Sequence, residues 1–292
     1  MASIAARQHF TVPIAHGRSL ELGARTLIMG IVNVTPDSFA GGIPDAQQAA
    51  ALALEMELEG ADIIDIGGES TRPGADEVTE EEELGRVIPV IERLKGRLAI
   101  PISVDTYKAR VAAEAVAAGA CIVNDISGLG YDPSLGGVVG DSGAGLVLMH
   151  TRGRSRDMYR EASYTDVTAE VMTELGQSMT RAIGAGVASD RIILDPGLGF
   201  AKRAADSYRL LANLPRLAAM GRPLLVGPSR KSFIAAALGN VPPAERDWGT
   251  AAAVTAAILL GAHIVRVHAV ASMSQAARVA DAVRDVAPGR QA

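Results

Sequence analysis

The chain has 292 residues, of which 48% are hydrophobic and 21% charged, a composition typical of a globular protein with a large core. A net charge of -5 and an aromatic content of 3% argue against a nucleic-acid surface, which needs cations and stacking platforms. The single cysteine, Cys121, excludes an intrachain disulfide, and no run has the roughly 18 apolar residues of a membrane span, so we expect a soluble, cytoplasmic protein.

The N-terminal segment, residues 1–25, contains two short alternating stretches separated by His16-Gly17. Alternation around a glycine-containing turn predicts a β-hairpin. We expect this hairpin to be an extension of a single domain that covers residues 1–292.

Eight short aliphatic runs follow, and each has a polar or charged residue at or just after its end. The runs are 27–34, 62–66, 100–104, 121–124, 145–149, 191–194, 223–226 and 263–267. Helical patterns lie between several of them, at 46–59, 80–94, 108–118, 167–183 and 272–286. Strands that alternate with helices predict a parallel sheet, and eight units favour a closed (β/α)₈ barrel, a TIM barrel. A doubly wound open sheet is the alternative.

Local signals support these boundaries. Thr79 and Glu82 form a capping-box pattern at the start of the second predicted helix. Gly60, Gly119 and Gly261 each follow a helical pattern and precede a strand, as expected of glycines that end helices. Active sites of such barrels lie at the carboxyl ends of the strands, so we expect the N-terminal hairpin to close the opposite end of the barrel.

Three cations follow the second, seventh and eighth runs, namely Arg72, Lys231 and Arg266. In the segment 226–233 we expect Ser229 to be a helix N-cap, with two cations, Arg230 and Lys231, in the first helical turn. Cations are unfavourable at the positive end of a helix unless an anion binds there. His268 lies two residues beyond Arg266 and faces the same side of its strand. The pattern predicts a site for a phosphate or diphosphate.

Hydrogen-bond acceptors end three other runs. Asp105, Asn124 and Asp195 follow the third, fourth and sixth runs. Carboxylates accept hydrogen bonds from adjacent N–H groups, such as those of guanine or a pterin. Asn33 offers a hard oxygen near the cations and is a candidate ligand for Mg²⁺ bridged by a diphosphate.

Taken together and in order, these segments resemble the motifs of the dihydropteroate synthase family. The matching segments are 33–39, 67–74, 103–106, 124–125, 148–150, 195–200, 227–233 and 266–268. The resemblance implies a homodimer of (β/α)₈ barrels that binds neither nucleic acid nor membrane. The implied reaction is the condensation of 4-aminobenzoate with 6-hydroxymethyl-7,8-dihydropterin diphosphate, which releases diphosphate in folate biosynthesis.

The resemblance also implies roles for individual residues. The implied pterin contacts are Asp105, Asn124, Ile126, Met149, Asp195, Phe200 and Lys231. The implied contacts to diphosphate and its Mg²⁺ are Asn33, Arg72, Arg266 and His268. The implied arylamine contacts are Thr71, Pro73, Lys231 and Ser232. Because the barrier lies in departure of the leaving group, we expect a dissociative substitution at carbon, with catalysis by Asp105, Lys231, Arg266 and His268.

The sequence departs from the family pattern in two places. The loop after the first strand, around Ala40 and Gly41, is one residue shorter and lacks an aspartate, which predicts weaker closure over the site. Ala269 replaces an aspartate after His268, which predicts a looser imidazole. Three alternatives stay open: a weakly catalytic pterin-binding paralogue, a methyltetrahydrofolate-dependent methyltransferase, and a Schiff-base aldolase that uses Lys231.

Overall fold

A parallel sheet of eight strands forms the centre of the computed structural model, which describes residues 7–287 except 36–44, 73 and 161. The strands are β3 (Leu27–Asn33), β4 (Ile63–Gly67), β5 (Ile102–Asp105), β6 (Ile122–Asp125), β7 (Gly145–Met149), β8 (Ile192–Asp195), β9 (Leu225–Val226) and β10 (Ile264–Val267). Neighbours pair in the order β8-β7-β6-β5-β4-β3-β10-β9. Leu194 also bridges to Leu224, and its amide donates to the Pro223 carbonyl at 2.9 Å, so the ends of the sheet meet. The predicted closed barrel is confirmed, and the open sheet was the wrong alternative.

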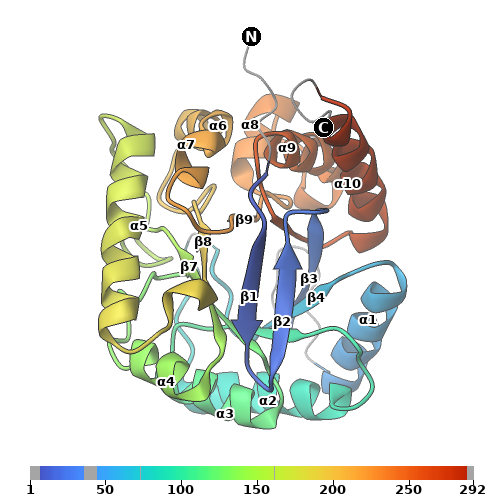
Figure 1. The fold of residues 1–292 in the computed structure, drawn as a ribbon, viewed down its shortest axis with the longest axis vertical. Coiled ribbons are helices and arrows are strands. Elements are labelled where there is room, and N and C mark those ends of the chain that lie inside the picture. Colours follow the sequence, from blue (N-terminus) through green and yellow to red (C-terminus); the bar gives the residue numbers. More distant parts are fainter. Residues whose placement is uncertain (1–6, 36–44, 73, 161, 288–292) are drawn as a thin grey trace.

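Helices surround the barrel (Figure 1). They are α1 (Ala46–Leu58), α2 (Glu80–Leu94), α3 (Ala109–Ala118), α4 (Leu135–Ser142), α5 (Val167–Gly184), α6 (Ala204–Ala212), α7 (Leu214–Ala218), α8 (Ser232–Leu238), α9 (Asp247–Leu259) and α10 (Val270–Asp285), with 3₁₀ turns η1 (Ser189–Arg191) and η2 (Pro243–Glu245). The five helices expected from the sequence agree with α1, α2, α3, α5 and α10 to within two residues. Within the described ranges, no helix is long and apolar enough to cross a membrane.

The predicted N-terminal hairpin is present as β1 (Phe10–Ile14) and β2 (Arg18–Leu22), which pair antiparallel. The hairpin lies across the barrel in Figure 1. Its inward side chains Val12, Ile14, Leu20 and Leu22 are buried against the amino-terminal halves of the strands, and the Ala15 amide donates to the Cys121 carbonyl. Cys121 itself is buried, as expected. The hairpin therefore seals the end of the barrel opposite the strands' carboxyl ends.

The helix boundaries follow the local signals. Thr79 accepts from the Glu82 amide, and the Glu82 carboxylate accepts from the Thr79 amide, which completes the capping box of α2. Gly60, Gly119 and Gly261 have φ values of 102°, 138° and 106°, a region open to glycine but strained for other residues. These turns return the chain to the next strand, so that the strand ends converge on one mouth.

Candidate active site

A cavity of about 560 Å³ opens at the carboxyl ends of the strands. It is lined by Ile31, Asn33, Thr35, Glu69, Ser70, Thr71, Arg72, Asp105, Met158, Tyr159, Gly199, Phe200, Gly227, Ser229, Arg230, Lys231, Ser232, Arg246, Arg266 and His268. The cavity brings together most of the residues predicted from the sequence. Four others, Asn124, Ile126, Met149 and Asp195, are not part of this lining, and Pro73 and the shortened loop after β3 lie outside the described residues.

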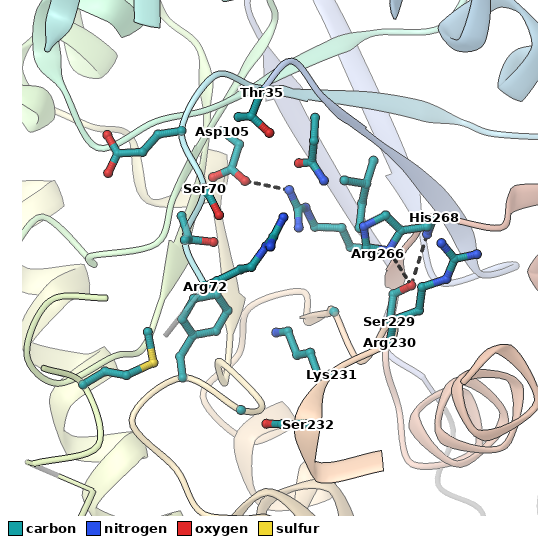
Figure 2. A pocket seen from close by; sticks show the side chains of 18 of the residues that line it. Thr35, Ser70, Arg72, Asp105, Ser229, Arg230, Lys231, Ser232, Arg266 and His268 are labelled. Atoms are coloured by element: carbon teal, nitrogen blue, oxygen red, sulfur yellow. Dashed lines mark hydrogen bonds and ion pairs between the residues drawn. The ribbon is translucent and has the colours of Figure 1, made fainter. Parts of the chain in front are cut away.

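Arg266 on β10 joins two buried carboxylates. Its Nε donates to Asp65 Oδ2 at 2.5 Å, and its Nη2 donates to Asp105 Oδ2 at 2.6 Å (Figure 2). Asn124 Nδ2 donates to the same Asp65 oxygen at 3.0 Å. The two carboxylates raise the pKa of Arg266 although burial lowers it, whereas burial raises the pKa of Asp105 to about 7 against the influence of Arg266. The sequence predicted cations and hydrogen-bond acceptors from different strands. The structure joins the two groups, because Arg266 donates directly to Asp65 and Asp105.

Asp65 is a site residue that the sequence analysis missed. It lies in the middle of β4 with no exposed surface, and its side chain points into the barrel because side chains alternate along a strand. An unpaired charge is costly inside a core. The acidic residue within the aliphatic run Ile63–Gly67 was therefore a sequence signal for a buried ion pair. That partner, Arg266, is about 200 residues away in the sequence.

Two further cations converge on Arg266. Figure 2 shows Arg72, from the loop after β4, directed toward Arg266, and Lys231 below both in the view. Lys231 Nζ lies 4.4 Å from the centroid of the Phe200 ring, within the range of a cation–π interaction. Burial lowers the pKa of Lys231 to about 8, although the negative charge of Asp195 opposes this shift. Lys231 is therefore mostly charged at pH 7.

The expected roles of Ser229 and Arg230 were wrong. Helix α8 begins at Ser232 with Lys231 in the N-cap position, so neither cation lies in the first helical turn. Arg230, with φ of 58°, forms a bidentate ion pair with Asp247 at 2.7 and 2.8 Å. Carboxylate pairing rather than an incoming anion balances its charge.

Ser229 orients His268 instead. The Ser229 hydroxyl accepts from the His268 backbone amide at 3.1 Å and lies 2.9 Å from Nδ1. We assign the hydroxyl as the donor to Nδ1, which places the ring proton on Nε2. Burial and Arg266 lower the pKa of His268 to about 3, which makes the ring neutral. Ser229 thus contacts the imidazole although position 269 has no aspartate, and the looser imidazole stays a prediction.

The remaining predicted pterin contacts adjoin the cavity. Ile126 and Met149 form a small apolar cluster with Tyr107, and Phe200 packs against that cluster while also lining the cavity. Asp195 is buried at the end of β8 and accepts from the Gly197 amide at 2.7 Å, and burial raises its pKa. We call these residues, Tyr107, Ile126, Met149, Asp195 and Phe200, the inner wall of the cavity.

The outer rim is formed by two loops. Thr71 comes from the loop after β4, and Ser232 begins α8. Met158 and Tyr159 come from the segment 151–160 after β7. Tyr159 Oη lies 3.4 Å from Ser232 Oγ, so this loop reaches the rim.

The comparisons with known proteins agree on one family. The model of the pterin-binding enzyme family matches residues 29–268. A dihydropteroate synthase from Synechocystis is 47% identical over 278 residues, which are 94% of this chain and 96% of that protein. The solved Yersinia pestis dihydropteroate synthase with a sulfonamide drug complex has a TM-score of 0.90 at 42% identity, covering 96% of this chain and 100% of that one. The Xanthomonas albilineans dihydropteroate synthase with 4-aminobenzoic acid has a TM-score of 0.86 at 46% identity, with 94% and 100% coverage.

This chain belongs to the dihydropteroate synthase family. As a member of that family it is a transferase with a pterin-binding TIM barrel. The comparisons give no support to the methyltransferase and aldolase alternatives. Because the similar proteins are matched over nearly their whole length, the likeness covers the hairpin, the barrel and the mouth alike.

The metal expected in a dihydropteroate synthase must fit the donors of this mouth. Among the residues that the structure describes, no group of three or more His, Cys, Asp or Glu side chains is arranged to hold a metal. Asn33 lines the cavity and offers one amide oxygen, while Asp105 is engaged by Arg266. Mg²⁺ commonly takes one or two protein oxygens together with substrate phosphates and water. The residues therefore fit Mg²⁺ that arrives with a diphosphate rather than an ion bound by protein alone.

Proposed function

We propose that this mouth joins 4-aminobenzoate to 6-hydroxymethyl-7,8-dihydropterin diphosphate and releases diphosphate. One observation carries the proposal: Arg266 is hydrogen-bonded to two carboxylates, Asp65 and Asp105, and lines the same cavity as two other cations, Arg72 and Lys231. A ligand with an N–H-rich ring at one end and phosphates at the other matches this polarity. Family membership supports the same reaction.

The pterin ring takes the inner part of the site. Asp105, Asn124 and Asp195 are the proposed acceptors and donors for its amino-pyrimidinone edge, with Lys231 beside them. Ile126, Met149 and Phe200 are the proposed apolar contacts to its faces. In their ionised forms, Asp105 and Asp195 would also favour the positive charge that develops on the exocyclic methylene.

The diphosphate takes the cationic part. Arg72, Arg266 and the Nε2–H of His268 stabilise the charge that grows on the leaving oxygen, with Asn33 beside them. When Mg²⁺ is bound, it would neutralise part of the diphosphate charge. The C–O bond breaks with its electron pair leaving on diphosphate, and the arylamine nitrogen then forms the new C–N bond with its lone pair and loses a proton to solvent. The substitution is therefore dissociative.

The arylamine takes the rim. Thr71, Pro73, Lys231 and Ser232 are the proposed contacts to 4-aminobenzoate. The amine is neutral at pH 7, so no strong base is required. Lys231 lies between the inner wall and the rim, where it can contact both substrates.

We also propose a cytoplasmic homodimer. Helix α10 exposes Val279 and Val283, which are 66% and 45% exposed, and Val286 follows at 80%. Spacings of four and three residues place these valines on one face of the helix. A second copy of the chain would cover this apolar stripe.

The test is turnover with both substrates, measured as diphosphate release with and without Mg²⁺. We expect Arg266→Ala to lower kcat by about 100-fold or more, because a charge partner of the leaving group is lost. The control is Arg93→Ala, which removes an arginine on the outer surface of α2. Pterin binding without turnover would identify a catalytically inactive paralogue, and an unchanged Arg266→Ala variant would contradict the assignment.

A further inference from the structure

A buried lysine lies behind the cavity wall and has no part in the proposed chemistry. Lys202, in the loop after β8, is 1% exposed. Its Nζ donates to the carbonyl oxygens of Gly197 at 3.0 Å, Phe200 at 2.9 Å and His150 at 3.2 Å. Nδ1 of the His150 ring lies 2.8 Å away and completes a set of four acceptors. A buried cation is costly unless such groups replace water.

The hydrogen-bond donors and acceptors fix the state of His150. Nε2 of the ring lies 2.8 Å from Glu174 Oε2, and a carboxylate only accepts, so Nε2 carries a proton. Burial and the charge of Lys202 lower the pKa of His150 to about 4, which leaves a neutral ring at pH 7. Nδ1 is then a lone-pair acceptor for Lys202. Four acceptors favour the ammonium form of Lys202, although burial lowers its pKa.

The charged groups that face this pair come from several elements. Asp195 on β8 and Glu174 on α5 favour the charged lysine, while Lys231 and Arg152 oppose it. Glu174 favours protonation of His150, and Arg152 opposes it. These fixed neighbours set the protonation of both Lys202 and His150. Replacing Lys202 by a neutral residue then removes one positive charge next to Nδ1 of His150.

The carbonyls that bind Lys202 belong to the loop that forms the inner wall. Gly199 and Phe200 line the cavity, and the carbonyl of Phe200 is one of the four acceptors. The Phe200 ring contacts Lys231 Nζ, and a Cβ added at Gly199 would meet Lys231 Cδ at 3.3 Å. The position of this loop therefore determines the position of Lys231.

The same network reaches the second loop at the mouth. Glu174 accepts from Arg152 Nε at 3.1 Å, and Arg152 Nη1 donates to the Ser163 carbonyl at 2.8 Å. Tyr164 Oη donates to the Ala201 carbonyl at 2.9 Å. These bonds join the loop that carries Phe200 to the loop that carries Met158 and Tyr159.

We propose that Lys202 is a positioning residue, which acts with His150 to fix Phe200 and Lys231 in the arrangement that binds the pterin. The inference rests on the proposed function, because it assigns the pterin to the wall that Lys202 supports. Lys202 touches no substrate in this assignment. Its effect passes through the carbonyls of Gly197 and Phe200.

The first experiment compares Lys202→Met with Lys95→Met, the same change at an exposed lysine at the end of α2. We expect Lys202→Met to raise KM for the pterin diphosphate by about tenfold to 100-fold, with a smaller loss in kcat, because the wall shifts relative to the substrate. Lys95→Met should match the wild type. Wild-type KM in a folded Lys202→Met variant would overturn the proposal.

A second pair of variants covers the case in which Lys202→Met does not fold. His150→Gln keeps an acceptor for Lys202 and a donor for Glu174, whereas His150→Leu keeps neither. We expect His150→Gln to stay within about threefold of the wild-type KM and His150→Leu to approach the value expected for Lys202→Met. Equal KM values in the two variants would overturn the proposal.

Nitrogen NMR of the His150 ring tests the pair without any turnover. We expect the wild-type ring to carry its proton on Nε2 and to remain neutral above pH 5, and the Lys202→Met ring to titrate above pH 5 once the adjacent charge is lost. An identical titration in the two proteins would overturn the proposal. Absence of turnover in the wild type would instead contradict the proposed function, and the ring spectrum would still decide the Lys202–His150 contact.

Discussion

Arg266 is shared by Asp65 and Asp105, so the protonation of Asp105 changes what the arginine can bind. Burial raises the pKa of Asp105 to about 7 from the usual 3.8, because the ionised form loses its hydration. The folded protein then binds this proton more tightly than the unfolded chain. The contribution to stability is therefore full below about pH 4 and is lost as the pH rises through about 7.

Pterin binding should show the opposite trend. An ionised Asp105 accepts N–H hydrogen bonds on both oxygens, whereas a protonated one carries no charge and keeps only part of its acceptor capacity. We expect the affinity for a pterin without diphosphate to fall as the pH is lowered from about 8 to 6, by up to about tenfold for each pH unit below the pKa. Titration calorimetry measures this affinity. Asp105→Asn should abolish this fall in affinity toward low pH, and a wild-type protein whose affinity does not fall would contradict the assignment.

For individual residues, the sequence predicted which side chains line most of the cavity but not which of them form ion pairs. Asn33, Asp105, Lys231 and Arg266 line the cavity as expected. The sequence did not reveal the ion pairs of Arg266 with Asp65 and of Arg230 with Asp247, because each joins elements that meet only after the barrel closes. Ser229 was predicted to be a helix N-cap, and its contact with His268 was missed for the same reason.

Among the elements, α2 offers a clean test of a local signal. Thr79 caps the helix with both bonds of the capping box, outside the cavity. We expect Thr79→Ala to lower the free energy of unfolding by about 1 kcal/mol, because an amide of the first turn loses its acceptor. Urea denaturation measures the change. Thr79→Ser keeps the hydroxyl and should remain near the wild type, so equal losses in the two variants would exclude capping as the cause.

The helices that the sequence missed explain where local patterns fail. Helix α4 contains three glycines within eight residues, and α7 is only five residues long. Such segments have weak intrinsic helicity and form because the barrel packs them. Strand β9 has two residues, and pairing with β10 and contact with β8 close the ring there. Repetition of the βα unit, rather than any single segment, made the closed barrel predictable.

For the whole molecule, the apolar stripe on α10 predicts the oligomeric state. We expect Val279→Glu to convert a dimer into a monomer at micromolar concentration, because a buried unpaired carboxylate opposes association. Light scattering after size-exclusion chromatography measures the mass. The control is Ile183→Glu on α5, which lies across the molecule from α10 in Figure 1. A dimeric Val279→Glu variant would place the interface elsewhere.

The N-terminal hairpin determines where substrates can enter the barrel and where products can leave it. The apolar side chains of β1 and β2 form one buried cluster with the side chains that fill the amino-terminal half of the barrel, so this end of the barrel is closed. Both substrates and both products must then pass through the opening of the cavity at the carboxyl ends of the strands. In the proposed assignment the pterin lies deeper than the arylamine, so we expect the relative depth of the two positions to impose an order of binding and release.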